Sequence, residues 1–79
     1  MEYGYLNVMV RFLGTFAERF GDQLVVELRG PATVKDILDV LGISESAVSL
    51  TIVNGTQVPF TAQLCDGASV LLVPPVIGG

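Results

Sequence analysis

A short amphipathic helix in the middle of the chain is the feature that most restricts its fold. Four apolar residues recur there at the spacing of one helix face: Val34, Ile37, Leu38 and Leu41. Thr33 can cap the start of this helix, Asp36 lies in its first turn, and Gly42 supplies the stop. In a chain of 79 residues, one such helix can cover one face of one sheet. The remaining sequence must therefore supply that sheet.

The residues before the helix predict two strands. Apolar side chains alternate with mixed ones through residues 6–13 and again through residues 23–29, which is the period of a strand with one buried face. We interpret residues 14–21 as the loop of a wide hairpin between them. Gly30 and Pro31 end the second strand.

The residues after the helix predict a second, shorter hairpin. Residues 50–53 form its first strand, and the Asn54-Gly55 pair that follows favours a type I′ turn. Residues 56–59 then return as a short strand at an edge of the sheet, because a proline ends it. Between the helix and this hairpin, residues 43–49 make a turn or a single helical turn.

The last strand is predicted at the centre of the sheet. Residues 69–73 follow a tight turn at Asp66-Gly67 and contain four consecutive apolar residues, which suits a strand covered on both faces. The order of elements indicates an α+β domain with one mixed sheet and a single helix packed across it. The other face of the sheet is then partly exposed, and apolar residues on it would form a natural docking surface.

The composition excludes several classes of protein. Apolar residues make up 51% of the chain and charged residues 15%, which is too hydrophobic for a disordered segment. With no histidine and one cysteine, a disulfide framework, a histidine- or cysteine-based zinc site and histidine-dependent catalysis are excluded. The net charge of -4 argues against a nucleic-acid partner. No signal region or membrane-spanning run is visible, so we expect no membrane association and a cytoplasmic location.

The C-terminal tail combines two rigid prolines, two apolar residues and two glycines without side chains. Its residues are Pro74, Pro75, Val76, Ile77, Gly78 and Gly79. The prolines cannot continue a central strand and hold φ near an extended value, so we predict a domain over residues 1–73 and a protruding tail over residues 74–79. Two terminal glycines can pass through a narrow channel and present a carboxylate to a reactive centre. A frayed chain end is the alternative interpretation.

This tail, with the Asp66-Gly67 turn and short apolar strand before it, resembles the small sulfur-carrier subunit of molybdopterin synthase. That subunit is a ubiquitin-like β-grasp protein, and the resemblance covers essentially the whole chain. It implies a mixed sheet of four to five strands with one main helix across one face. Thiazole-pathway sulfur carriers share the fold and the Gly-Gly end but usually lack the paired prolines.

The resemblance implies a role for each tail residue. A ubiquitin-activating-type adenylyltransferase would adenylate the carboxylate of Gly79 with ATP and Mg, and a sulfur donor system would convert it to a thiocarboxylate. Gly78 and the other tail residues would enter the partner's active site, these being Pro74, Pro75, Val76 and Ile77. The sulfur would pass to a pterin precursor in a complex with the large catalytic subunit.

The charge pattern indicates a carrier rather than an autonomous enzyme. No basic residue follows Lys35, whereas a carboxylate that attacks ATP needs cations to balance the developing negative charge. We therefore expect the partner to supply them, and we expect no cofactor, metal or catalytic residue in this chain itself.

Other functions remain open. The same tail could deliver sulfur for thiamine, tRNA or tungsten cofactor synthesis, a ubiquitin-like modifier would join Gly79 to a target lysine, and a passive binding module would leave the tail unused. We interpret Lys35 as an ordinary surface lysine. We interpret Cys65 as a small structural hydrophobe, since no cation near it in the sequence would generate a thiolate.

Overall fold

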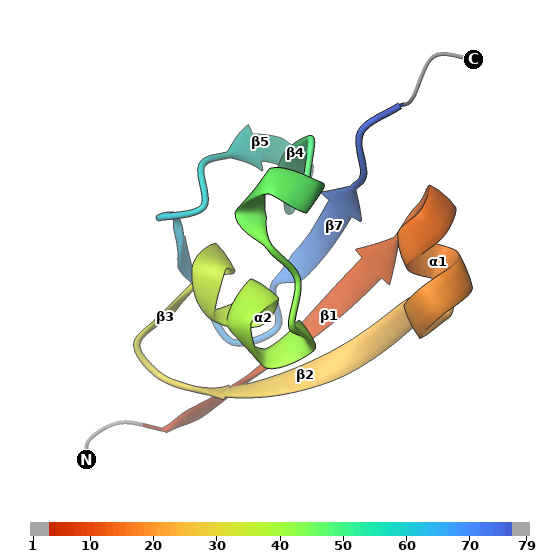
Figure 1. Ribbon diagram of the computed structural model, residues 1–79. Coiled ribbons are helices and arrows are strands. Elements are labelled where there is room, and N and C mark those ends of the chain that lie inside the picture. The colour runs from red at the N-terminus through yellow and green to blue at the C-terminus, as the bar shows by residue number, and fades with distance from the viewer. Residues whose placement is uncertain (1–3, 77–79) are drawn as a thin grey trace.

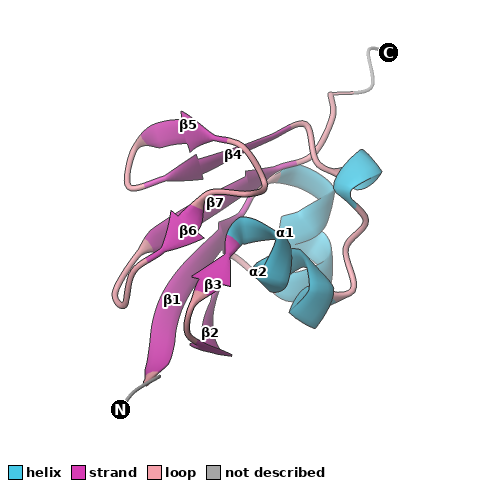
Figure 2. Ribbon diagram, turned by 90° about the vertical axis from the view of Figure 1, so that its left-hand side faces the viewer, coloured by secondary structure: helices cyan, strands magenta, loops and turns pink. Residues whose placement is uncertain are grey.

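A five-stranded mixed sheet with a helix across one face forms the body of the computed structural model, which describes residues 4–76 (Figures 1 and 2). The elements are β1 (Tyr5–Phe12), α1 (Gly14–Phe20), β2 (Gln23–Arg29), β3 (Ala32–Thr33), α2 (Val34–Leu41), the 3₁₀ turn η1 (Glu45–Ala47), β4 (Leu50–Val53), β5 (Thr56–Val58), β6 (Gln63–Leu64) and β7 (Ser69–Val73). The strand order is β2-β1-β7-β4-β5, with β1 and β7 parallel and the other pairs antiparallel. This confirms the predicted α+β class and the central last strand.

The core lies between α2 and the inner face of the sheet. β1 and β7 contribute side chains with no exposed surface, and α2 contributes its predicted apolar stripe: Val8, Val10, Val70 and Leu72 from the strands, and Val34, Ile37 and Leu38 from the helix. The outward-facing Leu71 and Val73 are only partly buried. The prediction that β7 is covered on both faces is therefore wrong, because only the inner face has a helix layer.

Both ends of α2 form as the sequence predicts. Thr33 and Asp36 make a capping box, in which the Thr33 N–H donates to Asp36 Oδ2 at 2.7 Å. Gly42 ends the helix in the left-handed conformation, at φ 72°. The first two helical N–H groups, of Val34 and Lys35, donate to carbonyls in the segment before β6. The helix start is therefore fixed both by its own cap and by the chain that follows β5.

The turn between β4 and β5 has the predicted Asn-Gly geometry. Asn54 and Gly55 both have positive φ, 51° and 87°, as a type I′ turn requires. The Asn54 side chain accepts a hydrogen bond from the Ser69 N–H at 3.0 Å, and the Asn54 N–H donates to the Ser69 carbonyl at 2.9 Å. The hairpin is thereby attached to the start of β7.

The connection over residues 14–21 is a helix and not the plain loop that the sequence predicts. α1 has no side-chain cap at its start, so the usual signal of a helix N-terminus is missing. Tertiary packing supports it instead: Phe16 is buried, and the rings of Phe12 and Phe20 stack with centroids 5.0 Å apart. The hairpin of β1 and β2 itself is confirmed.

Two further details correct or complete the sequence interpretation. β3 and β6 form a separate two-stranded sheet outside the predicted set of strands. Cys65, directly after the short strand β6, is exposed and so does not pack in the core as a small structural hydrophobe would. Lys35 is an exposed lysine, as expected, 3.4 Å from Asp39. Across residues 4–76, no helix has the length and apolar character needed to cross a membrane.

The capping box gives a stability prediction. Replacing Asp36 by alanine removes the acceptor for the Thr33 N–H, so we expect a loss of about 1 kcal/mol in the free energy of unfolding. For a domain of this size that is a fall in Tm of roughly 4–8 °C. Asp39→Ala is the matched control, because Asp39 lies on the same helix in an exposed pair with Lys35; its effect should stay within about 0.5 kcal/mol. Equal losses in thermal unfolding would contradict the assignment of the cap to Asp36.

Candidate functional site

The parallel pairing of β1 and β7 places the start of the tail beside the start of α1. In this pair Phe12 lies opposite Leu72, and parallel strands end at the same edge of a sheet. Leu13 and Gly14, which follow β1, and Pro74, which follows the last residue of β7, therefore lie at the same edge of the sheet. Figure 1 shows α1 and the C-terminal segment at this common edge.

Strand pairing stops where the prolines begin. The Val73 carbonyl accepts a hydrogen bond from the Ser49 N–H at 2.8 Å. Pro74 and Pro75 have no N–H group and cannot continue the ladder. Pro74 is half-buried, Pro75 is exposed, and Val76 is 92% exposed. The described part of the tail thus leaves the sheet without regular secondary structure.

The remaining predicted site residues, Ile77, Gly78 and Gly79, lie outside the described residues. The role of Gly79 as the modified end stays a prediction, and so does the entry of the tail into a partner's active site.

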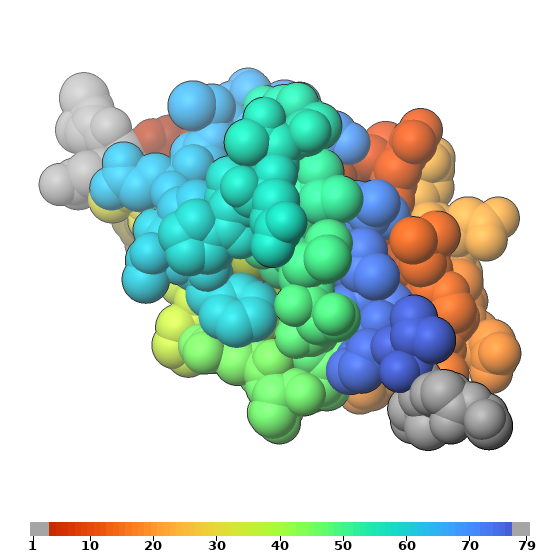
Figure 3. Space-filling model, turned by 90° about the horizontal axis from the view of Figure 1, so that it is seen from above, coloured from red at the N-terminus to blue at the C-terminus, as the bar shows by residue number. Residues whose placement is uncertain are grey.

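The base of the tail rests against the junction between β1 and α1. Gly14 has a positive φ of 57°, and a Cβ atom placed on it would lie 3.1 Å from Cγ of Pro74. A hollow of about 340 Å³ lies here, lined by Leu13, Gly14, Thr15, Val73 and residues 74–76. In Figure 3 the dark blue end of the described chain lies between the orange segment of α1 and the green segment before β4.

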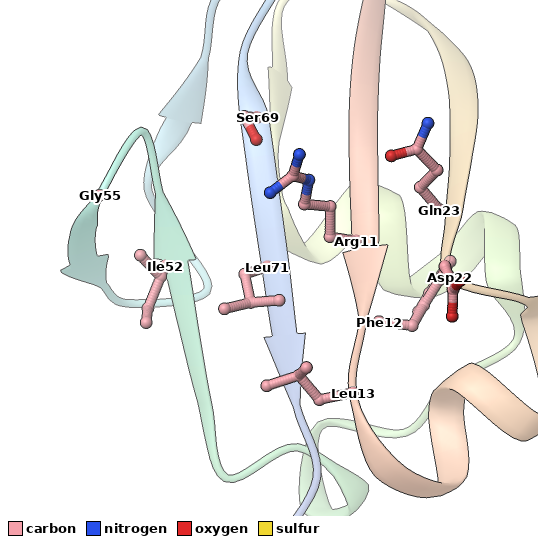
Figure 4. A pocket seen from close by; sticks show the side chains of 9 residues that line it. All are labelled: Arg11, Phe12, Leu13, Asp22, Gln23, Ile52, Gly55, Ser69 and Leu71. Carbon is pink, nitrogen blue, oxygen red and sulfur yellow. The ribbon is translucent and has the colours of Figure 1, made fainter.

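The outer face of the sheet carries a second, larger hollow of about 550 Å³ (Figure 4). Its lining includes Arg11, Leu13, Gln23, Ile52, Ser69 and Leu71. Apolar side chains from β4 and β7 lie beside the exposed Arg11 of β1. This confirms that the face away from α2 is partly exposed and partly apolar; its use in docking stays a prediction.

The two hollows adjoin at Leu13, which lines both. A partner on the outer face of the sheet would therefore also reach the base of the tail. The described residues that line the tail-base hollow are apolar residues, glycine and threonine, with no charged side chain among them. The hollow on the outer face of the sheet does have charged residues in its lining, namely Arg11 and Asp22.

The sequence predicts a tail but not the residues that lie against its base. Leu13, Gly14 and Thr15 fall in a segment predicted as a loop, and nothing in their residue types marks them as neighbours of Pro74. The available signal is the spacing of Phe16 and Phe20, which puts two aromatic rings on one face of a helical turn.

Comparisons with known proteins agree on the family and the fold. The model of the ThiS family matches residues 10–79. No curated protein matches the chain. Three similar solved structures are archaeal. The HVO 2177 protein of Haloferax volcanii is 28% identical with a TM-score of 0.80, covering 96% of this chain and 89% of its own.

The second structure is a protein from Pyrococcus furiosus assigned as molybdopterin converting factor, subunit 1. It is 26% identical to this chain with a TM-score of 0.73, and the match covers 90% of this chain and 99% of that one. The third, SAMP1 of Haloferax volcanii, is 24% identical with a TM-score of 0.75 and covers 96% and 100%; at that identity the likeness shows the fold alone. A designed protein based on ubiquitin also shares the fold, with a TM-score of 0.60. The predicted ubiquitin-like fold is confirmed.

The two faces of β7 give a prediction on adjacent leucines. Leu72 is fully buried against α2, so Leu72→Ala should leave a cavity and cost about 2–5 kcal/mol. Leu71 lies in the outer hollow and is already partly exposed, so Leu71→Ala should cost about 1 kcal/mol. Urea denaturation of both variants measures the difference. Comparable losses would contradict an open outer face.

Proposed function

The chain belongs to the ThiS family, and we propose that it is the sulfur-carrying small subunit of molybdopterin synthase. The observation that carries the proposal is the position of the tail. The central strand β7 ends at Val73, two prolines follow, and Val76 is 92% exposed. In the sequence, Ile77, Gly78 and Gly79 follow, and the carboxylate of Gly79 is the group that the proposed chemistry uses.

The chemistry needs only that carboxylate from this chain. An oxygen of the Gly79 carboxylate attacks the α-phosphorus of ATP, and pyrophosphate leaves, which gives an acyl adenylate. A sulfur nucleophile at the oxidation level of sulfide then attacks the carbonyl carbon, and AMP leaves with the electron pair of the C–O bond. The product is a thiocarboxylate, whose sulfur goes to a pterin precursor.

The charge distribution supports a division of labour with partners. No basic residue follows Lys35 in the sequence, and the described lining of the tail-base hollow carries no charge. The attack of one anion on another needs positive charge at the transition state. We propose that an adenylyltransferase of the ubiquitin-activating type supplies it with Mg, and that the large catalytic subunit supplies the groups for transfer to the pterin.

The paired prolines favour the molybdopterin pathway because thiazole-pathway sulfur carriers share the Gly-Gly end but usually lack them. Pro74 and Pro75 restrict the free tail and so reduce the entropy lost when it is ordered in a partner's channel. The likeness to the Pyrococcus furiosus converting-factor subunit, at 26% identity over 90% of this chain, also supports this choice. Delivery of sulfur for thiamine, tRNA or tungsten cofactor synthesis uses the same tail chemistry and is the alternative within the carrier class.

A second candidate function is conjugation to proteins. The chain shares its fold with SAMP1 of Haloferax volcanii. A second crystal structure with this fold is small archaeal modifier protein 1 of the same organism. A modifier would pass through the same adenylate, but a lysine amine would attack in place of sulfide, and an isopeptide bond at Gly79 would result.

Intact-mass spectrometry tests the carrier function. After incubation with ATP, Mg, an activating enzyme and a sulfur donor, we expect the mass to rise by the difference between one sulfur and one oxygen atom. A chain that lacks Gly79 should show no such change. Cys65→Ser should still show it, which separates a thiocarboxylate from a persulfide on the exposed Cys65, because a persulfide adds a whole sulfur atom.

Two further outcomes decide between the candidates. An unchanged mass with partners that modify another carrier would contradict the proposal. Conjugates on denaturing gels that depend on Gly79 would favour the modifier. For the pathway, the thiocarboxylated chain should bind a large molybdopterin synthase subunit and convert a pterin precursor; a chain that is thiocarboxylated but inert in that assay serves another sulfur pathway.

A further inference from the structure

The start of α1 lies in contact distance of the first tail residue. A Cβ atom on Gly14 would be 3.1 Å from Cγ of Pro74, which is closer than ordinary van der Waals contact between carbon atoms. Glycine at this position therefore allows the proline ring to lie directly against the backbone of the β1–α1 junction. We propose that Gly14 is a positioning residue that sets the direction in which the tail leaves the domain.

The junction that carries Gly14 is held firmly by the core. Phe16, two residues later, is 6% exposed, and its N–H donates to the Leu13 carbonyl at 3.1 Å. At the other end of α1, Phe20 stacks on Phe12 of β1. The N–H of Phe12 in turn donates to the Asp22 carbonyl at 3.0 Å. A group added to Gly14 therefore displaces Pro74 more readily than it displaces α1.

The residue before Pro74 is held as well. Val73 pairs with Leu50 of β4, and the Val73 carbonyl accepts a hydrogen bond from the Ser49 N–H at 2.8 Å. The Val73–Pro74 peptide bond is planar and the ring fixes φ of Pro74, so pressure on the ring is taken up by a small change in ψ of Val73, which tilts the ring away from Gly14. The segment beyond this point, beginning with Pro75 and Val76, then points in a new direction while the domain keeps its fold.

The direction matters if the tail must enter a partner's channel, so this part of the inference rests on the proposed function. The Gly79 carboxylate has to meet the α-phosphate of ATP while the domain docks on the partner's surface. A misplacement of about 1 Å at a reacting group can cost about 100-fold in rate. A small rotation at Pro74 is amplified along the residues that follow it.

The test compares four variants. Gly14→Ala adds the Cβ atom that meets Pro74. Gly42→Ala is the matched control, because Gly42 also has a positive φ, 72°, but a Cβ atom there would meet nothing within 4 Å. Pro74→Ala removes Cγ, and the double variant Gly14→Ala/Pro74→Ala places the new Cβ atom where there is no longer a ring to meet.

Two measurements are made on each variant. The first is an NMR measurement on the isolated chain, which needs no partner. It records the chemical shift of the Val76 amide and the proton–proton contact between residue 14 and residue 74. The second is the rate of adenylation by an activating enzyme, followed by pyrophosphate release. We expect Gly14→Ala to move the Val76 signal and to lower kcat about tenfold. We expect Gly42→Ala to leave the Val76 signal in place and to change kcat by no more than about twofold. Both variants lose stability, because alanine is strained in the left-handed backbone conformation.

The double variant tests the contact itself. In the Pro74→Ala background, Gly14→Ala should have no further effect on the adenylation rate, because the two substitutions act through one contact. Additive effects would overturn the proposal, as would a Val76 signal that Gly14→Ala leaves in place. A shifted Val76 signal with an unchanged rate would overturn the inferred effect of the tail's direction on adenylation. If the wild-type chain is not adenylated at all, the proposed function fails, while the NMR comparison still decides whether Gly14 sets the direction of the tail.

Discussion

The parallel pairing of β1 with β7 is the interaction on which the rest of the structure depends. It joins the first and last strands in the middle of the sheet, and the turn at Asp66 and Gly67 sets its register. There the Asn7 N–H donates to Asp66 Oδ1 at 2.8 Å, the Gly67 N–H donates to the Asn7 carbonyl, and the Met9 N–H donates to the Ala68 carbonyl. A shift of one residue in this register would turn Val70 and Leu72 away from α2. It would also move the end of β7, and with it the tail, relative to α1.

The single helix layer explains why one face of the molecule is suited to a partner. α2 covers the inner side of the sheet, and the outer side keeps Leu71, Ile52 and Arg11 within reach of solvent. A larger domain would cover this face with a second layer. Here the exposed face continues through Leu13 to the base of the tail. A partner that docked on the sheet would thus lie beside the base of the tail, and binding energy gained on the sheet would help to order the tail.

The elements that the sequence predicts correctly are those whose signals are local. Thr33, Asp36 and Gly42 mark both ends of α2, and Asn54-Gly55 marks the short hairpin, because each acts through bonds within a few residues. α1 depends instead on burial of Phe16 beneath it, and β3 and β6 are too short to show a period. The same distinction applies at the site. The prolines are a local signal for the end of the last strand. The contact between Gly14 and Pro74, in contrast, joins residues far apart in the sequence, and it exists only once β1 and β7 have paired.

The fold by itself does not distinguish a sulfur carrier from a protein modifier, and the reason is chemical. Both functions begin with the same adenylate on a C-terminal glycine, and they diverge only in the nucleophile that attacks it, sulfide or an amine. Under the proposed function a partner supplies that nucleophile, so selection between the two would act through what this chain presents to each partner. The chain can vary three things: the side chains of the outer face, the direction of the tail and its own charge. With a net charge of -4 and no basic residue after Lys35, the chain would bind faster to a partner whose surface is positive around its active site, since complementary potentials raise the rate of encounter.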